Sequence, residues 1–137
     1  MATKITIEAT INAPVEKVWK MWISPEHITK WNNASPEWHT PKSEVDLRVG
    51  GKYTSRMEAK DGSMGFDFWG TYTKINTNEH LETTMGDGRM WNTMFEPSGN
   101  TTKVIEVFEA ENENSVDMQK MGWQSILNNF KSYVENN

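Results

Sequence analysis

The first part of the chain changes from an alternating hydrophobic pattern to a helical one. From Lys4 to Asn12 apolar and polar residues alternate, which predicts a half-buried strand. The apolar residues on one face of this strand are Ile5, Ile7, Ala9 and Ile11. Helical spacing follows, with Pro14 suited to the first turn, at Val15, Val18, Trp19 and Trp22. A second short helix is predicted after Ser24, a favourable N-cap residue, with Pro25 at its first position.

The middle of the chain, from Val45 to Glu111, has the pattern of successive strands separated by turns. The turn signals are Gly50-Gly51, Asp61-Gly62, Asn76 to Asn78, Asp87-Gly88 and Ser98-Gly99-Asn100. Connections this short predict antiparallel hairpins. Together with the first strand, the sheet is expected to have six or seven strands. The preceding stretch from Asn32 to Glu44 contains two prolines and no period, and it is predicted to be a loop with Trp38 and His39 near its centre.

The last part of the chain predicts one long helix from Met118 to Val134. Its apolar stripe consists of Trp123, Leu127, Phe130 and Val134. Ser115 is a natural N-cap for this helix. Gly122 is out of place near its middle, because glycine costs about 1 kcal/mol relative to alanine in a helix interior. The large indole of Trp123 follows it directly.

The order of these elements predicts a single α+β domain over residues 1–137. One strand, two short helices, a meander of strands and a long C-terminal helix favour a curved antiparallel sheet with the helices on one face. A sheet of this size twists and curls. A curled sheet that holds a long helix tends to leave a space between the two, where small apolar ligands bind.

Composition and charge exclude several classes of function. The chain has 137 residues, a net charge of −5 and no cysteine. Disulfides, thiol catalysis and cysteine-ligated metals are therefore excluded, and the acidic balance argues against nucleic acid. No apolar run is long enough to span a bilayer. The charged, alternating N-terminal sequence does not have the pattern of a signal peptide, so a cytoplasmic protein is expected.

Several stretches, in order along nearly the whole chain, resemble a known family. They are NAPVEKVWKMWISPEHITKW, DLRVGGKYTSRMEAKDGS, FDFWGTYTKIN, HLETTMGDGR and MGWQSILNNFKSYVE. The chain resembles the helix-grip fold of the START-like superfamily, which includes polyketide cyclases and pathogenesis-related plant allergens. Within it, the chain is most similar to the group related to the activator of the heat-shock-protein-ninety ATPase. The resemblance implies that the C-terminal helix lies across the concave sheet. Gly122 would then let the helix approach a strand or leave room in a cavity, and Trp123 would plug or wall that cavity.

The aromatic residues of the strands are candidates for the walls of such a cavity. Alternation places Phe66, Phe68 and Tyr72 on one face of a strand and Trp69 on the other, and the sequence does not decide which face points inward. A dry aromatic core is the competing interpretation. The candidate ligand-binding residues are Trp38, Arg56, Phe66, Phe68, Trp69, Tyr72, Trp91, Glu106, Trp123 and Leu127.

One charged position in the strands is a candidate polar anchor. Glu106 shares a strand face with Val104 and Phe108. If that face is inward, the carboxyl needs a partner or a raised pKa, and Arg56 or Arg89 could pair with it. The alternative is that these charges form cross-strand ion pairs on a solvated face, each worth less than about 1 kcal/mol.

No motif in the sequence assigns a catalytic set, a metal or a cofactor. The three histidines have no ligand spacing, and nucleophile, phosphate-loop and dinucleotide motifs are absent. His39 could cover the mouth of a pocket, although a solvated loop histidine is the simpler interpretation.

Three functions are compatible with the sequence. The favoured one is binding of an apolar small molecule (a lipid, a flavonoid or a polyketide-like compound) in an internal cavity, by a monomer or weak dimer. The resemblance implies two alternatives, namely an interaction with a heat-shock chaperone ATPase and an enzyme of the polyketide cyclase or aromatase type. The enzyme would need a titrating group in the cavity, for which Glu106 and His39 are the candidates.

Overall fold

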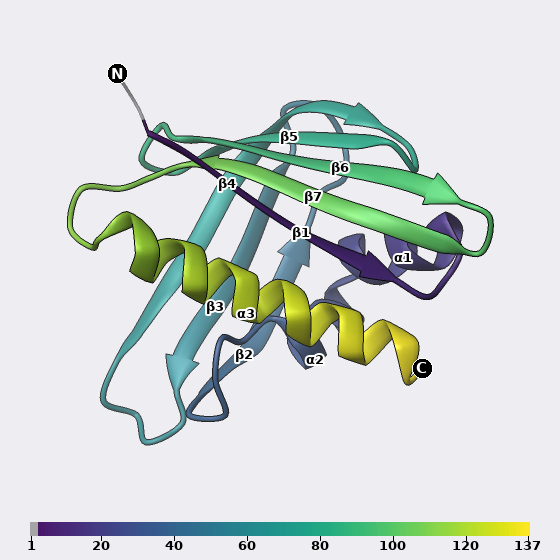
Figure 1. The fold of residues 1–137 in the computed structure, drawn as a ribbon. Coiled ribbons are helices and arrows are strands. Elements are labelled where there is room, and N and C mark those ends of the chain that lie inside the picture. Colours follow the sequence, from purple (N-terminus) through teal and green to yellow (C-terminus); the bar gives the residue numbers. More distant parts are fainter. Residues whose placement is uncertain (1–2) are drawn as a thin grey trace.

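A computed structural model of the chain describes residues 3–137. One strand, two short helices, six further strands and a long helix follow one another along the chain (Figure 1). The strands are β1 (Lys4–Ile11), β2 (Trp38–Val45), β3 (Lys52–Ala59), β4 (Gly65–Asn76), β5 (His80–Met85), β6 (Met90–Ser98) and β7 (Thr101–Glu109). The helices are α1 (Val15–Ile23), α2 (Pro25–Trp31) and α3 (Val116–Glu135). The predicted α+β fold class is confirmed.

All seven strands form one antiparallel sheet in the order β1-β7-β6-β5-β4-β3-β2. Strands β2 to β7 are joined as successive hairpins, as their short turns predicted. Each of these five connections contains one residue with positive φ. These residues are Gly50, Gly62, Asn78, Gly88 and Gly99. Glycine and asparagine enter this region of backbone conformation most readily, which explains why they mark the turns.

The predicted loop from Asn32 to Glu44 is in part wrong, because strand β2 occupies most of it at the edge of the sheet. The prediction was wrong because Pro41 lacks the backbone N–H that a strand within a sheet donates to its neighbour, which made the stretch look like a loop. An edge strand tolerates such a residue, and the β2–β3 register shifts between His39 and Lys42, on either side of it. The strand predicted from Val45 up to the Gly50-Gly51 turn is also wrong, because β2 ends at Val45. Arg48 lies in the β2–β3 connection, where its Nε is 2.8 Å from Asp46 Oδ2.

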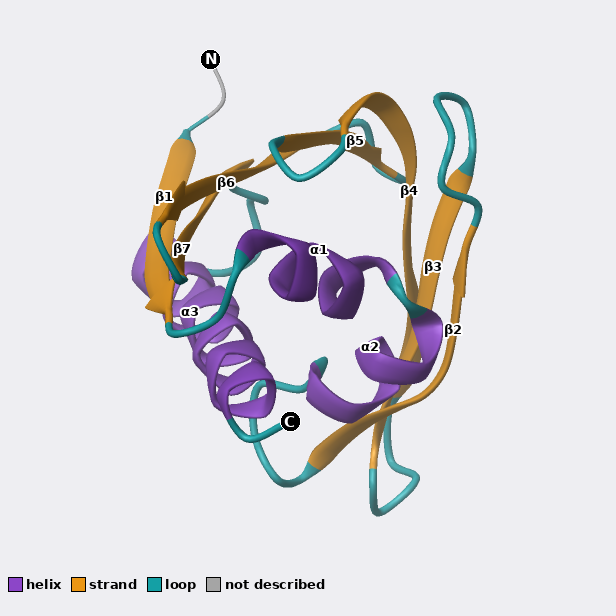
Figure 2. Cartoon of the chain, turned by 90° about the vertical axis from the view of Figure 1, so that its right-hand side faces the viewer, coloured by secondary structure: helices purple, strands orange, loops and turns teal. Residues whose placement is uncertain are grey.

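The sheet curls around the three helices, and α3 runs across its concave face (Figures 1 and 2). Ser115 caps α3 as predicted, since its side chain accepts a hydrogen bond from Met118 N. The predicted apolar stripe of α3 points into the core, with Leu127, Phe130 and Val134 fully buried. In residues 3–137 no helix is long and apolar enough to cross a membrane.

Candidate functional site

A cavity of about 230 Å³ lies between the concave face of the sheet and α3. Every layer of the fold contributes to its walls. The lining residues are Trp22 of α1, Trp31 of α2, Asn32 and Ala34 of the α2–β2 loop, Tyr53 and Met57 of β3, Phe66 and Phe68 of β4, Trp91 of β6, Glu106 of β7, and Gly122, Trp123 and Ile126 of α3. Ala34 and Phe66 are also exposed to solvent. The cavity therefore reaches the surface between the α2–β2 loop and β4.

Gly122 leaves space in this cavity and does not serve a close approach of helix to strand. A Cβ atom built on Gly122 would have no heavy atom within 4 Å outside its immediate helical neighbours. Of the two roles that the resemblance implied for this glycine, the structure supports the second. Gly122 thus lowers the stability of the helix and at the same time leaves empty volume beside the aromatic walls.

Trp123 forms one wall, and its ring is fixed by other aromatic rings. It stacks on Phe108 at a centroid distance of 3.8 Å and an interplanar angle of 11°. It also meets Trp91 at 5.4 Å and Phe68 at 6.0 Å, both nearly edge to face. Trp91 in turn meets Tyr53 at 5.9 Å. Edge-to-face contact is a preferred geometry of aromatic pairs, so the contacts of Trp91 with Trp123 and Tyr53 hold these walls in place.

Glu106 is the carboxyl group of the cavity, and only 3% of its surface is exposed. Its Oε1 accepts a hydrogen bond of 2.9 Å from Trp91 Nε1. Burial disfavours the charged form and raises the pKa of Glu106 to about 8, although the hydrogen bond from Trp91 opposes this effect. Glu106 is therefore mainly protonated at neutral pH. The face of β7 that Glu106 shares with Val104 and Phe108 is therefore the inward one.

A second polar group of the cavity is the phenol of Tyr53. Its hydroxyl oxygen accepts hydrogen bonds from Ser55 Oγ at 2.8 Å and, over a longer 3.4 Å, from Asn32 Nδ2. Burial raises the pKa of Tyr53 to about 12. The phenol is thus neutral over the physiological range and adds polarity without charge.

The structure brings half of the predicted site residues together. Those that line the cavity are Phe66, Phe68, Trp91, Glu106 and Trp123. Tyr72 and Leu127 are buried in the core beside it. Trp38 does not line the cavity, but its ring lies 6.1 Å from that of Phe66.

Arg56 and Trp69 lie on the convex face of the sheet, away from the cavity. Arg56 Nε is 2.9 Å from Glu58 Oε2, and its NH1 is 3.5 Å from Asp67 Oδ1. Trp69 is 39% exposed and has the ammonium of Lys52 over its ring at 4.4 Å. The Arg56 charge therefore forms ion pairs on a solvated face, one with Glu58 of the same strand and one with Asp67 of the neighbouring strand β4. For Arg56 the alternative interpretation, a solvated face, is thus correct.

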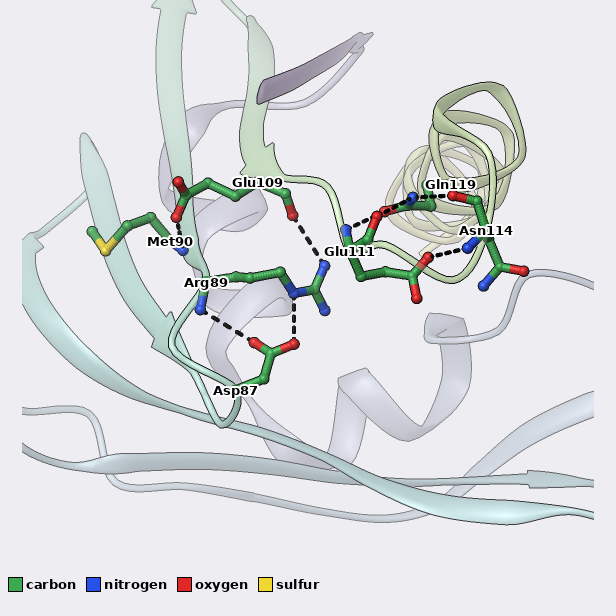
Figure 3. A network of polar contacts seen from close by, with 7 residues as sticks. All are labelled: Asp87, Arg89, Met90, Glu109, Glu111, Asn114 and Gln119. Carbon is green, nitrogen blue, oxygen red and sulfur yellow. Dashed lines mark hydrogen bonds and ion pairs between the residues drawn. The ribbon is translucent and has the colours of Figure 1, made fainter. Parts of the chain in front are cut away.

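The predicted pairing of Glu106 with an arginine is wrong. Arg56 is held on the convex face, and Arg89 is held at the β5–β6 turn (Figure 3). Arg89 Nε donates to Asp87 Oδ2 at 2.7 Å, and its NH1 donates to the carbonyl of Glu109 at 3.0 Å. The cavity carboxyl thus has an indole N–H as its partner instead of a cation.

The start of α3, which positions Gly122, is held by a buried glutamine in the same view (Figure 3). Gln119 Oε1 accepts from Glu111 N at 2.8 Å, while its Nε2 donates to the carbonyls of Glu111 and Asn114 at 3.1 and 2.8 Å. Glu111 Oε1 accepts from Asn114 N at 2.8 Å. These contacts tie the loop after β7 to the helix one turn before Gly122.

Sequence reasoning missed seven of the lining residues. They are Trp22, Trp31, Asn32, Ala34, Tyr53, Met57 and Ile126. The signal for Trp22 was its helical stripe, and the signal for Tyr53 and Met57 was their alternation with Arg56. His39, the candidate for the mouth, lies in β2 with its Nε2 3.7 Å from Glu58 Oε1. Among residues 3–137 no three metal-ligating side chains lie close enough together to hold an ion.

Comparison with known proteins places the chain in a family. The family model described as activator of Hsp90 ATPase homolog 1-like protein matches residues 12–135. The chain belongs to this family. The match spans both short helices, the whole meander and α3, and thus every element that lines the cavity. The predicted resemblance is therefore confirmed. No curated protein matches the chain.

Solved structures agree with this assignment. The AHSA1-like protein from Aeromonas hydrophila, solved by NMR, is 47% identical, with a TM-score of 0.91 and coverage of 98% of this chain and 93% of its own. Chr148 from Cytophaga hutchinsonii is 53% identical, with a TM-score of 0.84 and the same coverage. Protein NE0264 from Nitrosomonas europaea has a TM-score of 0.82 and covers 97% of this chain and 94% of its own, but at 18% identity it shows the shared fold alone.

Proposed function

We propose that this protein binds a small apolar or amphipathic molecule in the cavity between the sheet and α3. The observation that carries the proposal is the combination of empty volume at Gly122 with aromatic walls and one buried carboxyl. Sites for small molecules are concave and mostly apolar, with a few polar groups that orient the ligand. A larger apolar residue such as leucine at position 122 would have taken up part of this space and strengthened the helix.

The volume limits the size of the bound part of the ligand. An engineered apolar cavity of about 150 Å³ holds benzene, and drug-sized ligands occupy pockets of about 300 Å³ or more. At about 230 Å³ the cavity suits a body of one or two rings or a short branched chain. A longer ligand would extend past Ala34 and Phe66 toward solvent.

The test is an NMR titration of the tryptophan indoles with a panel of flavonoids, fatty acids and aromatic polyketides. Saturable shifts at Trp91 and Trp123, with the signal of Gly122 moving too, are expected. Indoles that stay unmoved across the panel would contradict the proposal. Protein partners, such as the ATPase that the family description names, would then be the next candidates.

A variant pair sharpens this test. Gly122→Leu places an apolar side chain in the empty volume, so binding should weaken at least tenfold while the fold persists. Met121→Leu changes an exposed neighbour on the same helix and should leave binding unaltered. Equal affinity in both variants would mean that the ligand binds elsewhere.

A second candidate function is proton-transfer catalysis on the bound molecule. It is supported by the pKa of Glu106, about 8, because a general acid or base is most effective when its pKa lies near the working pH. Glu106→Gln should then abolish turnover of a bound polyketide-like substrate while binding persists. Unchanged turnover in this variant would remove catalysis by Glu106 from consideration.

A further inference from the structure

Resting on the proposed function, we infer that the ligand is an uncharged ring compound with a hydrogen-bond acceptor, such as a ketone or quinone carbonyl, to which the Glu106 carboxyl donates. This inference names the ligand's chemical class and the atom that recognises it. It stands on the arrangement of Glu106 and Trp91 in the cavity and on the charges of the lining residues.

The indole of Trp91 determines which carboxyl oxygen carries the proton. Its N–H donates to Oε1 of Glu106 at 2.9 Å, so Oε1 serves as an acceptor and the acidic proton resides on Oε2. Within residues 3–137 every fully inaccessible side-chain nitrogen or oxygen has a hydrogen-bond partner. No protein group among them contacts Oε2 as a hydrogen-bond partner, so this oxygen reaches the cavity space. A ligand acceptor there would satisfy the O–H donor.

The charges around the cavity favour an uncharged ligand. Among the lining residues the only titratable group besides Glu106 is Tyr53, which is neutral up to a pKa of about 12. The strands on either side of Glu106 place Ile7 and Thr93 opposite it, and neither titrates. A carboxylate ligand would bury its negative charge without a cation, which is costly in an apolar site.

A competing class of ligand is an organic ammonium ion. Aromatic rings with one carboxylate also form cages for such cations. The two classes make opposite predictions for pH. A carbonyl needs the protonated carboxyl, so its affinity falls when Glu106 ionises above a pKa of about 8. An ammonium ion needs the carboxylate, so its binding releases a proton and strengthens as Glu106 ionises.

The experiment measures binding of four naphthalene probes of nearly equal size by indole NMR shifts at pH 6, 7, 8 and 9. The probes are 2-acetonaphthone, which has a carbonyl; 2-isopropenylnaphthalene, which lacks it; 2-naphthoate; and 1-(2-naphthyl)ethylammonium. We expect 2-acetonaphthone to bind at least tenfold more tightly than the other three at pH 6. Its advantage over the hydrocarbon should shrink as the pH rises to 9.

Three variants distinguish the contribution of the Glu106 carboxyl to binding from that of the other lining residues. Glu106→Gln keeps an N–H donor at every pH, so the preference for the ketone should persist and its pH dependence should vanish. Glu106→Leu has no donor, so the ketone and the hydrocarbon should bind alike. Glu96→Gln removes an exposed carboxyl on β6 and should behave like the wild type.

The outcomes distinguish this inference from the proposed function. If the ketone and the hydrocarbon bind equally at all pH values, the cavity binds ligands but Glu106 does not recognise an acceptor, and the inference is wrong. Tightest binding of the ammonium probe, with affinity that increases with pH, would overturn it in favour of a cation site. If none of the four probes shifts an indole, cavity binding itself fails and the inference fails with it.

Discussion

Two regions under α3 are both rich in aromatic residues, and Trp22 and Trp31 border both, yet one is packed and the other is hollow. Around Phe130 the space is filled by rings. Phe130 is 0% exposed and meets Trp22 and Trp31, each at 4.8 Å and nearly edge to face. Trp22 and Trp31 stack on each other at 5.0 Å, and Trp22 also meets Phe95 at 6.0 Å.

About two turns earlier on the same helix, Gly122 faces a region where Phe68, Trp91 and Trp123 leave the cavity open. Aromatic content alone therefore does not distinguish a core from a site. The two regions differ in the side chain that the helix presents and in the buried carboxyl, Glu106, that only the hollow region contains.

The packed region should be far more sensitive to truncation than the rim of the hollow one. Phe130→Ala removes a fully buried ring, which should lower the free energy of unfolding by about 3–5 kcal/mol. Phe66→Ala makes the same chemical change at a cavity residue that is 47% exposed, so it should cost much less. Urea unfolding of both variants provides the measurement. Equal losses would mean that the two regions are packed alike.

Glu106 should make the hollow region a source of instability that depends on pH. Its folded pKa, about 8, lies above its unfolded value, so between these two values the folded state holds a proton that the unfolded state has lost. The stability contribution of this proton is complete below the unfolded pKa and disappears as the pH rises to the folded pKa, at about 1.4 kcal/mol per pH unit.

Glu106→Gln removes this dependence with little change of shape. At pH 7 the variant should therefore be more stable than the wild type by about 3 kcal/mol, and near pH 4.5 the difference should vanish. The pH profile of the wild type alone is not diagnostic, because carboxyls with lowered pKa values, such as Asp61, have the opposite effect. Their contribution to the stability of the fold is lost as the pH falls, whereas that of Glu106 is lost as the pH rises. A difference between the two proteins that stays constant with pH would show that Glu106 does not titrate on unfolding.

The overall fold could be predicted because its signals are local. Turns with positive φ carry glycine or asparagine, and the alternation of β1 and the stripe of α3 match their buried faces. Strand β2 was missed because Pro41 has no backbone N–H to donate to a neighbouring strand. Only an edge strand tolerates this, and sequence alone does not show which strand is at the edge.

The candidate site was predicted in part, because the inward face depends on the register of the whole sheet. A slip of one residue exchanges the two faces of a strand, and the β4–β5 register shifts between Tyr72 and Lys74. The sequence therefore placed Trp69 and Phe68 on opposite faces of their strand without showing which of them points inward, and the same held for Arg56 on its own strand. The empty volume could not be predicted from Gly122 alone, because a glycine that permits close packing looks the same in the sequence.

Part of the cavity should be fillable without loss of stability. Gly122→Ala improves helix propensity by about 1 kcal/mol, and its new methyl group has no heavy atom within 4 Å beyond its helical neighbours. The free energy of unfolding should therefore rise by up to that amount, measured by urea unfolding. A loss of stability would mean that the space at Gly122 is occupied or that the helix is strained there.

The smallest effect is expected on the convex face, where charge is plentiful and burial is slight. Arg56→Met removes the ion pairs with Glu58 and Asp67, whose side chains are 38% and 61% exposed. Exposed pairs contribute at most about 1 kcal/mol, and added salt weakens them. The loss in the free energy of unfolding, measured with urea, should thus be below that value and shrink further in 1 M salt.

The ligand affinity should not change in Arg56→Met, because Arg56 lies on the opposite face of the sheet from the cavity. A tenfold loss of affinity in this variant would show that the two faces are coupled through β3, and the contrast between a functional concave face and a passive convex face would no longer hold.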